Sequence, residues 1–366
     1  MKQALLSIIF IVCLFQLSAQ SDASSTKKPE INVLAFIDVF YTFDFNEPTG
    51  ANRQDFFYQY NRHNEFNLNM GLIQLEVNHE KYRSKIGFHS GTYANDNYVA
   101  EQGVFQNIYQ ANVGIALNKK NSLWLDAGIF ESHLGFESAL SIENWNLTRA
   151  LASENSPYYL SGAKLNWQAN QKWDFSLLVT NGWQRIQRVQ GNSLLSFGTQ
   201  ASYTNEKGLK FNWSTFVGTD DPDSTRRMRY FNNLYSEWQI SKKLGVLLGF
   251  DFGLQEKTKN SNSYNNWMVY SFITRYQLTN NLRTALRFEY FEDNEELIIQ
   301  NLANQGFKST SISLNIDFQA NDYTSLRLEG RHLFSSDKTF LKEKSFSNNN
   351  FFITISLAML FNHNLR

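Results

Sequence analysis

The sequence has little cysteine and little proline. Cys13 is the only cysteine among 366 residues, so no disulfide can form within the chain. The four prolines are Pro29, Pro48, Pro157 and Pro222, and long stretches between them contain none. Because proline cannot donate a backbone hydrogen bond to a β-ladder, these proline-free stretches can form long strands.

Neither charge is in excess, since 34 Lys and Arg balance 34 Asp and Glu. A nucleic-acid-binding protein would need a basic surface, so we expect no nucleic acid partner. Long apolar runs are absent after residue 17, although a membrane helix needs ~18 or more apolar residues. The composition therefore excludes a helical membrane protein.

The N-terminus resembles an export signal. Lys2 precedes an apolar run over residues 4–17, and "LSAQ" places Leu17 and Ala19 at the spacing that signal peptidase recognises. The run is shorter than the ~20 residues of a membrane anchor. We predict that residues 1–19 form a signal peptide that directs the chain through the inner membrane. Cleavage of this peptide removes Cys13. Residues 20–31 are predicted to form a short lead.

The rest of the chain alternates apolar and polar residues. The pattern is clear in "VLAFIDVFYTFDF" (33–45), "LGVLLGFDFGLQ" (244–255) and "STSISLNIDFQ" (309–319). A period of two residues predicts a β-strand with one apolar face, and the second face here is small and polar. Strands of β-sandwiches are usually ~5 to 6 residues long, whereas a tilted strand needs ~9 to 11 residues to cross a bilayer. The length favours a membrane barrel.

Sixteen such runs predict an all-β protein, a closed antiparallel transmembrane β-barrel of about 16 strands (14–18) over residues 32–361, with a tail at 362–366. The runs are 33–45, 66–78, 82–93, 105–118, 122–131, 158–169, 173–183, 194–204, 209–219, 229–240, 244–256, 266–278, 282–292, 308–319, 323–334 and 351–361. In residues 66–78 the apolar positions change from even-numbered to odd-numbered residues near Gly71, which predicts a β-bulge there. Connections alternate between short polar turns such as "QISKKLGV" and long segments such as "GTDDPDSTRRMR". This predicts short periplasmic turns and long outer loops.

Aromatic residues near the strand ends predict two belts at the membrane interfaces. The residues concerned are Tyr41, Phe43, Trp124, Trp167, Trp173, Trp213, Trp238, Trp267 and Phe361.

One connection, residues 131–157, is too long for a periplasmic turn. Within it "ENWNLTRALAS" (143–153) predicts a short helix that "ENSP" ends. A loop folded into the lumen would narrow the pore, and its charged side chains Glu143, Arg149 and Glu154 would face water as a filter. The alternative is an external loop packed over the mouth of the barrel.

Charges of both signs fall on the polar face of the late strands. A basic series could give mild anion preference, or these residues could pair across strands in a polar, water-filled interior. The residues are Arg275, Arg283, Arg287, Glu289, Arg327, Glu329 and Arg331. The same face of other strands carries Arg83, Lys85, Asp126, Lys164 and Asp251.

Several segments resemble one protein family. "YNRHNEFNLNMGLIQLE", "LWLDAGIFESHLGFESAL", "WNLTRALASENSPYYLSGAKLNW" and "NGWQRI" together resemble the OmpL-like β-barrel porin family of Gram-negative outer membranes. The resemblance covers residues 35 to 361 and implies a barrel that conducts small hydrophilic solutes. It implies a pore-shaping role for Gly135, Glu137, Asn144, Arg149, Pro157 and Tyr159. The candidate constriction set is therefore Glu137, Glu143, Asn144, Arg149 and Glu154.

An outer-membrane barrel can have two other functions. An outer-membrane hydrolase would need a catalytic constellation, but Ser132, His133 and Ser138 in "ESHLGFES" are a weak signal, and no GxSxG or HExxH motif is present. A gated specific transporter would need an N-terminal plug domain, for which the short lead leaves no room. We expect a weakly selective outer-membrane porin without cofactor or metal. Its expected partners are outer-membrane lipids, small hydrophilic solutes and the barrel-insertion machinery; a homo-oligomer stays open.

Overall fold

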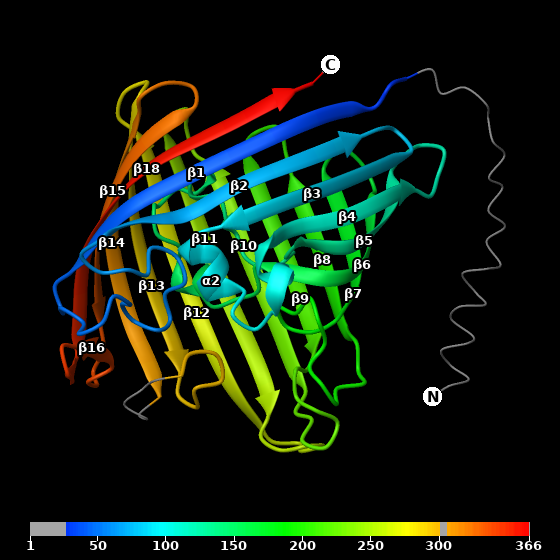
Figure 1. Cartoon of the computed structure of the whole chain (residues 1–366). Helices are drawn as coiled ribbons and strands as arrows, with labels where there is room; N and C mark the ends of the chain where they lie inside the picture. Colours follow the sequence, from blue (N-terminus) through cyan, green and yellow to red (C-terminus); the bar gives the residue numbers. More distant parts are fainter. Residues whose placement is uncertain (1–26, 301–305, 366) are drawn as a thin grey trace.

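The computed structural model describes residues 27–300 and 306–365, and within them sixteen strands form one closed antiparallel barrel (Figure 1). Each strand pairs with its neighbours in the sequence, and β1 pairs with β18 to close the barrel. The predicted fold is confirmed. The strands are β1 (Glu30–Asp44), β2 (Phe66–Asn78), β3 (Tyr82–Ser90), β4 (Ile108–Ala116), β5 (Leu123–Glu131), β6 (Tyr159–Gln168), β7 (Trp173–Thr180), β8 (Ser196–Thr204), β9 (Leu209–Gly218), β10 (Arg229–Gln239), β11 (Leu244–Glu256), β12 (Tyr264–Gln277), β13 (Leu282–Asp293), β14 (Phe307–Gln319), β15 (Thr324–Phe334) and β18 (Asn349–Asn364).

The strand limits differ slightly from the expected ones at both ends of the barrel. β1 begins at Glu30, and β18 continues to Asn364 where a tail was expected after residue 361. The predicted signal peptide, residues 1–19, lies outside the described residues.

The two faces of each strand have opposite environments, as the alternating pattern predicts. On β1, Ile37 is 52% exposed on the outer face, whereas Asp38 is fully buried on the inner face. β2 contains a bulge, because Asp38 pairs with Met70 and Val39 with Leu68, which leaves Asn69 between them unpaired. The bulge lies two residues before Gly71, and after it Ile73 and Leu75 are exposed on the outer face, whereas Met70 and Leu72 are buried on the inner face.

Other elements occur in the long connections. They are α2 (Thr92–Asn97), the 3₁₀ helices η1 (Gly103–Asn107) and η2 (Ser141–Glu143), α3 (Leu151–Glu154), and the hairpin of β16 (Phe340–Lys342) and β17 (Ser345–Ser347). Among the described residues no helix is long and apolar enough to cross a membrane. The long connections lie at one end of the barrel and the short turns at the other (Figure 1).

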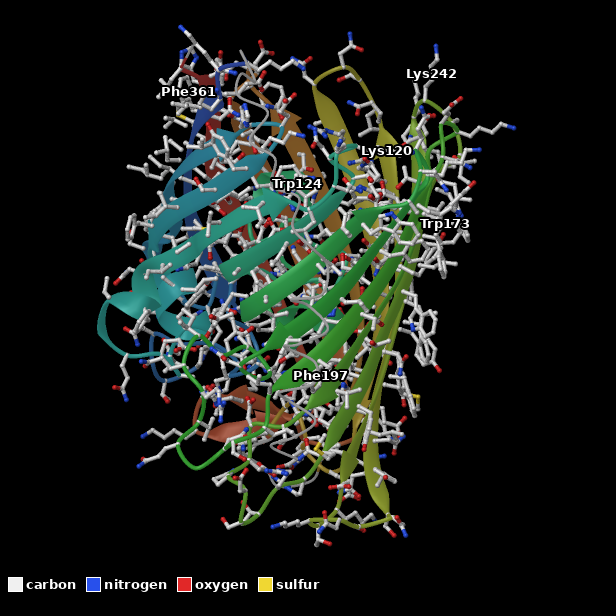
Figure 2. The ribbon with its side chains drawn as sticks, turned by 90° about the vertical axis from the view of Figure 1, so that its right-hand side faces the viewer. Lys120, Trp124, Trp173, Phe197, Lys242 and Phe361 are labelled. Atoms are coloured by element: carbon white, nitrogen blue, oxygen red, sulfur yellow. The ribbon has the colours of Figure 1, made fainter. Side chains whose placement is uncertain are left out.

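The outer surface carries many, but not all, of the expected belt residues. Trp173 and Phe361 are exposed on the outer face, and in Figure 2 they lie toward the end with the short turns that contain Lys120 and Lys242. Trp267 was wrongly assigned to a belt. It points inward, is 2% exposed and stacks on Phe231, with ring centroids 5.8 Å apart.

Candidate channel interior

The connection between β5 and β6, residues 132–158, lies against inward-facing residues of β11 to β15. Two glycines of β11 make room for its aromatic side chains. A Cβ on Gly245 would lie 2.8 Å from the Trp145 ring, and a Cβ on Gly249 would lie 2.6 Å from the Phe136 ring. The small residues noted on the inner face of this strand therefore allow close approach of the connection, which we call the inner segment.

Three arginines of the barrel wall hold the backbone of the inner segment. Arg287 of β13 donates to the carbonyl of Thr148 at 2.6 Å. Arg331 and Arg327 of β15 donate to the carbonyls of Arg149 at 2.9 Å and Asn144 at 3.0 Å, respectively. These side chains are nearly inaccessible to solvent. Each satisfies backbone oxygens that would otherwise be buried without a partner.

Acidic and amide side chains of the same wall bind backbone N–H groups of the inner segment. Leu147 N donates to Asn315 Oδ1 at 3.1 Å. Thr148 N and Leu151 N donate to Glu329 and Glu289, each at 2.6 Å. These bonds explain why the expected helix over 143–153 is wrong: only η2 and the short α3 form, because wall side chains take N–H groups that a helix would use internally.

The charged wall residues also pair with one another. Arg287 lies 3.2 Å from Glu289 and 2.7 Å from Glu329, and Arg331 lies 2.5 Å from Glu289. Arg327 lies 2.6 Å from Asp317. Of the two arrangements considered for these charges, the structure has cross-strand pairing rather than a free basic series.

The remaining two predicted lumen charges also face inward, at the end of the barrel with the short turns. The Arg275 guanidinium lies 4.5 Å from the centre of the Trp145 ring. Arg283 donates to Gln319 at 3.2 Å.

The five constriction candidates fall into two groups. Glu137, Asn144, Arg149 and Glu154 have largely buried side chains, whereas Glu143 is exposed. Arg149 and Glu154 were expected to face water; instead both are 3% exposed.

Buried contacts explain why these four side chains do not face water. The Arg149 guanidinium lies 3.5 Å from the Tyr158 ring centre, and Glu154 accepts hydrogen bonds from Gln59 N at 2.7 Å and from the Tyr158 hydroxyl at 2.8 Å. Glu137 accepts from Ala150 N at 2.7 Å, and Asn144 binds both backbone groups of Ser138 at 2.8 Å. These residues shape the inner segment itself.

The opposite wall carries charges that remain accessible. Side chains of Arg83 and Lys85 on β3 are 35% and 37% exposed, compared with 0% for Arg287, Glu289, Glu329 and Arg331. Sequence reasoning placed Arg83 and Lys85 in the lumen but did not rank them above the late strands. The alternation pattern gives only the face of a strand, and it does not show which wall the inner segment covers.

Comparison with known proteins agrees with this architecture. A family model described as "Putative beta-barrel porin-2, OmpL-like" matches residues 30–361. The chain belongs to this family. The resemblance noted from the sequence is confirmed, and the protein is an outer-membrane porin. No curated protein matches the sequence.

Solved porin structures resemble the OmpL-like porin in fold at very low sequence identity. An anion-selective porin from Comamonas acidovorans has a TM-score of 0.61 at 8% identity and covers 91% of this chain and 100% of its own. The outer membrane channel DcaP of Acinetobacter baumannii has a TM-score of 0.60 at 10% identity, covering 92% and 99%. OmpT of Vibrio cholerae, in a trimer form, has a TM-score of 0.58 at 8% identity, covering 92% and 100%.

Proposed function

We propose that the OmpL-like porin allows passive diffusion of small hydrophilic solutes, and that water and solutes pass along the β3 to β6 side of the lumen. The observation that carries this proposal is the contrast in exposure between the two walls. Charges on β13 and β15 are sealed under the inner segment, whereas Arg83 and Lys85 on β3 remain accessible. A polar, accessible wall is the surface that a water-filled pore requires.

Among the five constriction candidates, Glu143 is the one with an exposed side chain. Partial burial raises the pKa of Glu143, while the hydrogen bond with Ser138 and the positive charge of Lys85 lower it. The inner segment narrows the channel, and Glu143 and Lys85, with Arg83, form its charged constriction.

The channel is weakly selective because its accessible cations have acidic neighbours. Arg83 Nε donates to Asp126 at 2.7 Å, and Lys85 Nζ lies 2.9 Å from Glu76. Lys164 of β6 lies opposite Asp126 in the register of β5 and β6. Opposite charges at short distance cancel most of each other's long-range field, so neither anions nor cations are strongly excluded.

A non-enzymatic channel is supported by the positions of the candidate catalytic residues. Ser132 Oγ accepts a hydrogen bond from Leu134 N at 3.1 Å, and the His133 ring bonds the carbonyl of Thr215 at 2.9 Å. A serine hydrolase needs its histidine hydrogen-bonded to the nucleophilic hydroxyl. Both side chains instead hold the start of the inner segment in place.

Export and assembly form part of the same proposal. The signal peptide is cleaved after Ala19, and the barrel-insertion machinery folds the mature chain into the outer membrane. A homo-oligomer is supported by the trimer form named for the Vibrio cholerae neighbour. Chemical cross-linking of the protein in native membranes tests assembly: a single band at monomer mass would contradict it.

Single-channel recording of refolded residues 20–366 in a planar bilayer tests the function. We expect discrete, steady conductance steps with a small reversal potential under a salt gradient. Liposomes that contain the barrel should swell in solutions of small sugars. A correctly folded barrel that gives neither conductance nor swelling would contradict the proposal.

A further inference from the structure

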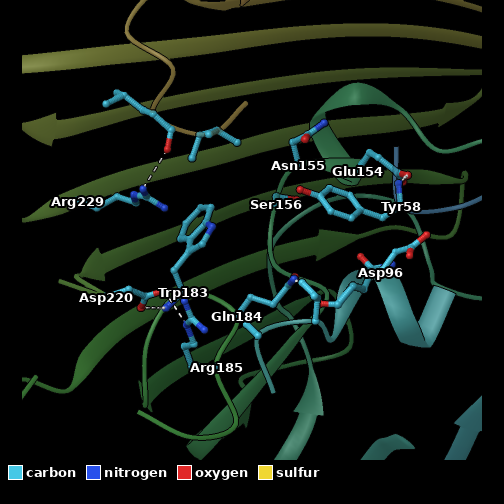
Figure 3. A pocket seen from close by; sticks show the side chains of 15 residues that line it. Tyr58, Asp96, Glu154, Asn155, Ser156, Trp183, Gln184, Arg185, Asp220 and Arg229 are labelled. Carbon is cyan, nitrogen blue, oxygen red and sulfur yellow. Dashed lines mark hydrogen bonds and ion pairs between the residues drawn. The ribbon is translucent and has the colours of Figure 1, made fainter. Parts of the chain in front are cut away.

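A cavity of about 240 Å³ lies among the long connections at the outer mouth of the barrel (Figure 3). Its lining includes Asp96, Glu154, Trp183, Asp220 and Arg229. A second cavity of about 260 Å³ shares Trp183, Asp220 and Arg229 with it. The two cavities therefore meet at the Trp183 indole, which Figure 3 shows beside Arg229.

The turn "NGWQRI", residues 181–186, fixes the position of Trp183. Trp183 N donates to Asp220 Oδ1 at 2.8 Å, and the Gln184 side chain accepts from Tyr158 N at 2.8 Å. Ile186 N donates to Glu101 at 2.7 Å. These bonds connect the turn to three other connections of the outer mouth. The indole is thus held on a rigid support, as a binding site requires.

Arg229 presents a guanidinium group on which the more distant charges of Asp220, Asp221 and Asp293 act. Its Cζ lies 5.0 Å from the centre of the Trp183 ring and 5.5 Å from that of Trp267. Nε and Nη2 of Arg229 donate to Gln255 Oε1 at 2.9 and 2.6 Å, respectively. Nη2 also donates to the carbonyl of Leu297 at 3.3 Å. In the described part of the chain no carboxylate lies within ion-pair distance of Arg229, and Nη1 donates to no protein atom.

The carboxylates of the first cavity are all engaged elsewhere. Asp220 lies 3.2 Å from Arg185 Nε, and Asp96 lies 2.9 Å from Arg62 Nη1. Glu154 accepts hydrogen bonds from Gln59 N and the Tyr158 hydroxyl. Among the described residues, Arg229 is therefore the arginine of this cavity that has no ion pair, whereas Arg185 pairs with Asp220.

A second polar group of the first cavity also lacks a partner. Asn97 is 3% exposed, lines this cavity, and its Oδ1 has no hydrogen bond. It can accept from a hydroxyl or amide of a ligand. Glu295 and Glu296 line only the second cavity, where they disfavour an anion.

We propose that the first cavity binds small organic carboxylates at the outer mouth. The carboxylate accepts from Arg229 Nη1, the carbon skeleton packs on the Trp183 indole, and a hydroxyl on the ligand can donate to Asn97. Because the site offers charge-assisted hydrogen bonds beside an apolar surface, it should bind a carboxylate more tightly than a neutral ligand of the same shape. The inference rests on the proposed function, because the ligand is a solute that the channel admits.

Calorimetric titration of the folded barrel in detergent tests the site. Cyclohexanecarboxylate is the probe, and cyclohexanecarboxamide is its neutral control. We expect the carboxylate to bind and the amide to bind at least ~10-fold more weakly. Arg229→Gln should weaken carboxylate binding by a similar factor, and Arg229→Lys should retain part of it. Arg227→Gln is the matched control, because Arg227 pairs with Asp221 at 2.8 Å and lines only the second cavity.

The outcomes separate the site from the channel. Equal binding of the acid and the amide, or equal binding by the wild type and the Arg229→Gln variant, would overturn the inference even if the barrel conducts. Binding that depends on Arg229 in a barrel without conductance would retain the site but overturn the proposed function. Heat-modifiable gel mobility confirms that each variant has folded, and Trp183→Phe, which keeps an aromatic ring, should weaken binding less than Trp183→Ala.

Discussion

At the residue scale, inward-facing arginines of the same barrel have different roles. Arg287 is fully buried and donates to the carbonyl of Thr148, whereas the Arg83 side chain is 35% exposed opposite the inner segment. A buried arginine that pairs with buried carboxylates contributes to the structure, and its charge is neutralised by its neighbours. An accessible arginine can act on passing ions. Exposure, rather than residue type, therefore separates the filter from the scaffold.

Lys85→Gln should shift the ion preference of the channel. Removing one accessible positive charge leaves Glu76 and Glu143 less compensated, so the reversal potential under a salt gradient should move toward cation preference by a few millivolts. Lys242→Gln removes the same charge from a turn outside the lumen (Figure 2) and should leave the reversal potential unchanged. Equal shifts in both variants would place the ion path elsewhere.

Gly128→Ala should destabilise the barrel. Gly128 has φ +127°, and a Cβ there would lie 2.2 Å from the carbonyl oxygen of Ala111. Such strain costs about 1–3 kcal/mol, which urea unfolding in detergent can measure. Gly330→Ala is the control, because the nearest atom to its Cβ would be 3.9 Å away. Similar unfolding free energies for the two variants would refute this account of β5.

At the element scale, the inner segment is held by the barrel wall more than by its own secondary structure. Its N–H groups bind Asn315, Glu329 and Glu289, and its carbonyls bind wall arginines. These partners lie far away in the sequence. Local propensity therefore predicted a helix that the folded barrel does not form.

Replacing Glu289 and Glu329 together with Gln should loosen the inner segment. Removing one partner of a buried ion pair lowers the free energy of unfolding by about 3–5 kcal/mol. In this double variant Arg287 and Arg331 would lose their carboxylate partners Glu289 and Glu329. We expect larger single-channel conductance and noisier open states from a barrel that still folds. Glu292→Gln is the control, because Glu292 pairs with Lys308 on the outer face. We expect this variant to leave the conductance unchanged. Unchanged conductance in the double variant would mean that the segment is held by other contacts.

A disulfide between the inner segment and the wall should leave conductance unchanged. Asn146 Nδ2 lies 3.3 Å from Ser313 Oγ, and residues 20–366 contain no cysteine. Asn146→Cys with Ser313→Cys should therefore form one bond in the folded barrel, detectable by non-reducing electrophoresis. If oxidation abolished conductance, the segment would have to move during transport. The two single-cysteine variants are the controls.

At the scale of the whole molecule, the sequence predicted the barrel well and the channel less well. Alternation over two residues sets which face of each strand points inward, so the sixteen strands and the inward position of Arg83 and Arg287 followed from the pattern. The pattern carries no information about which inward residues the inner segment covers. Trp267 illustrates the same limit, because a tryptophan near a strand end suits both a membrane belt and the interior.

The most direct test of the proposed channel is a thiol-labelling experiment on Lys85→Cys in residues 20–366. Single-channel conductance is recorded before and after addition of a bulky, membrane-impermeant methanethiosulfonate reagent. Because Lys85 lies on the accessible wall, we predict rapid labelling and a clear drop in the size of each conductance step. Glu289→Cys, beneath the inner segment, should react slowly and change little. Steps of unchanged size in fully labelled Lys85→Cys would contradict a channel along the β3 to β6 wall.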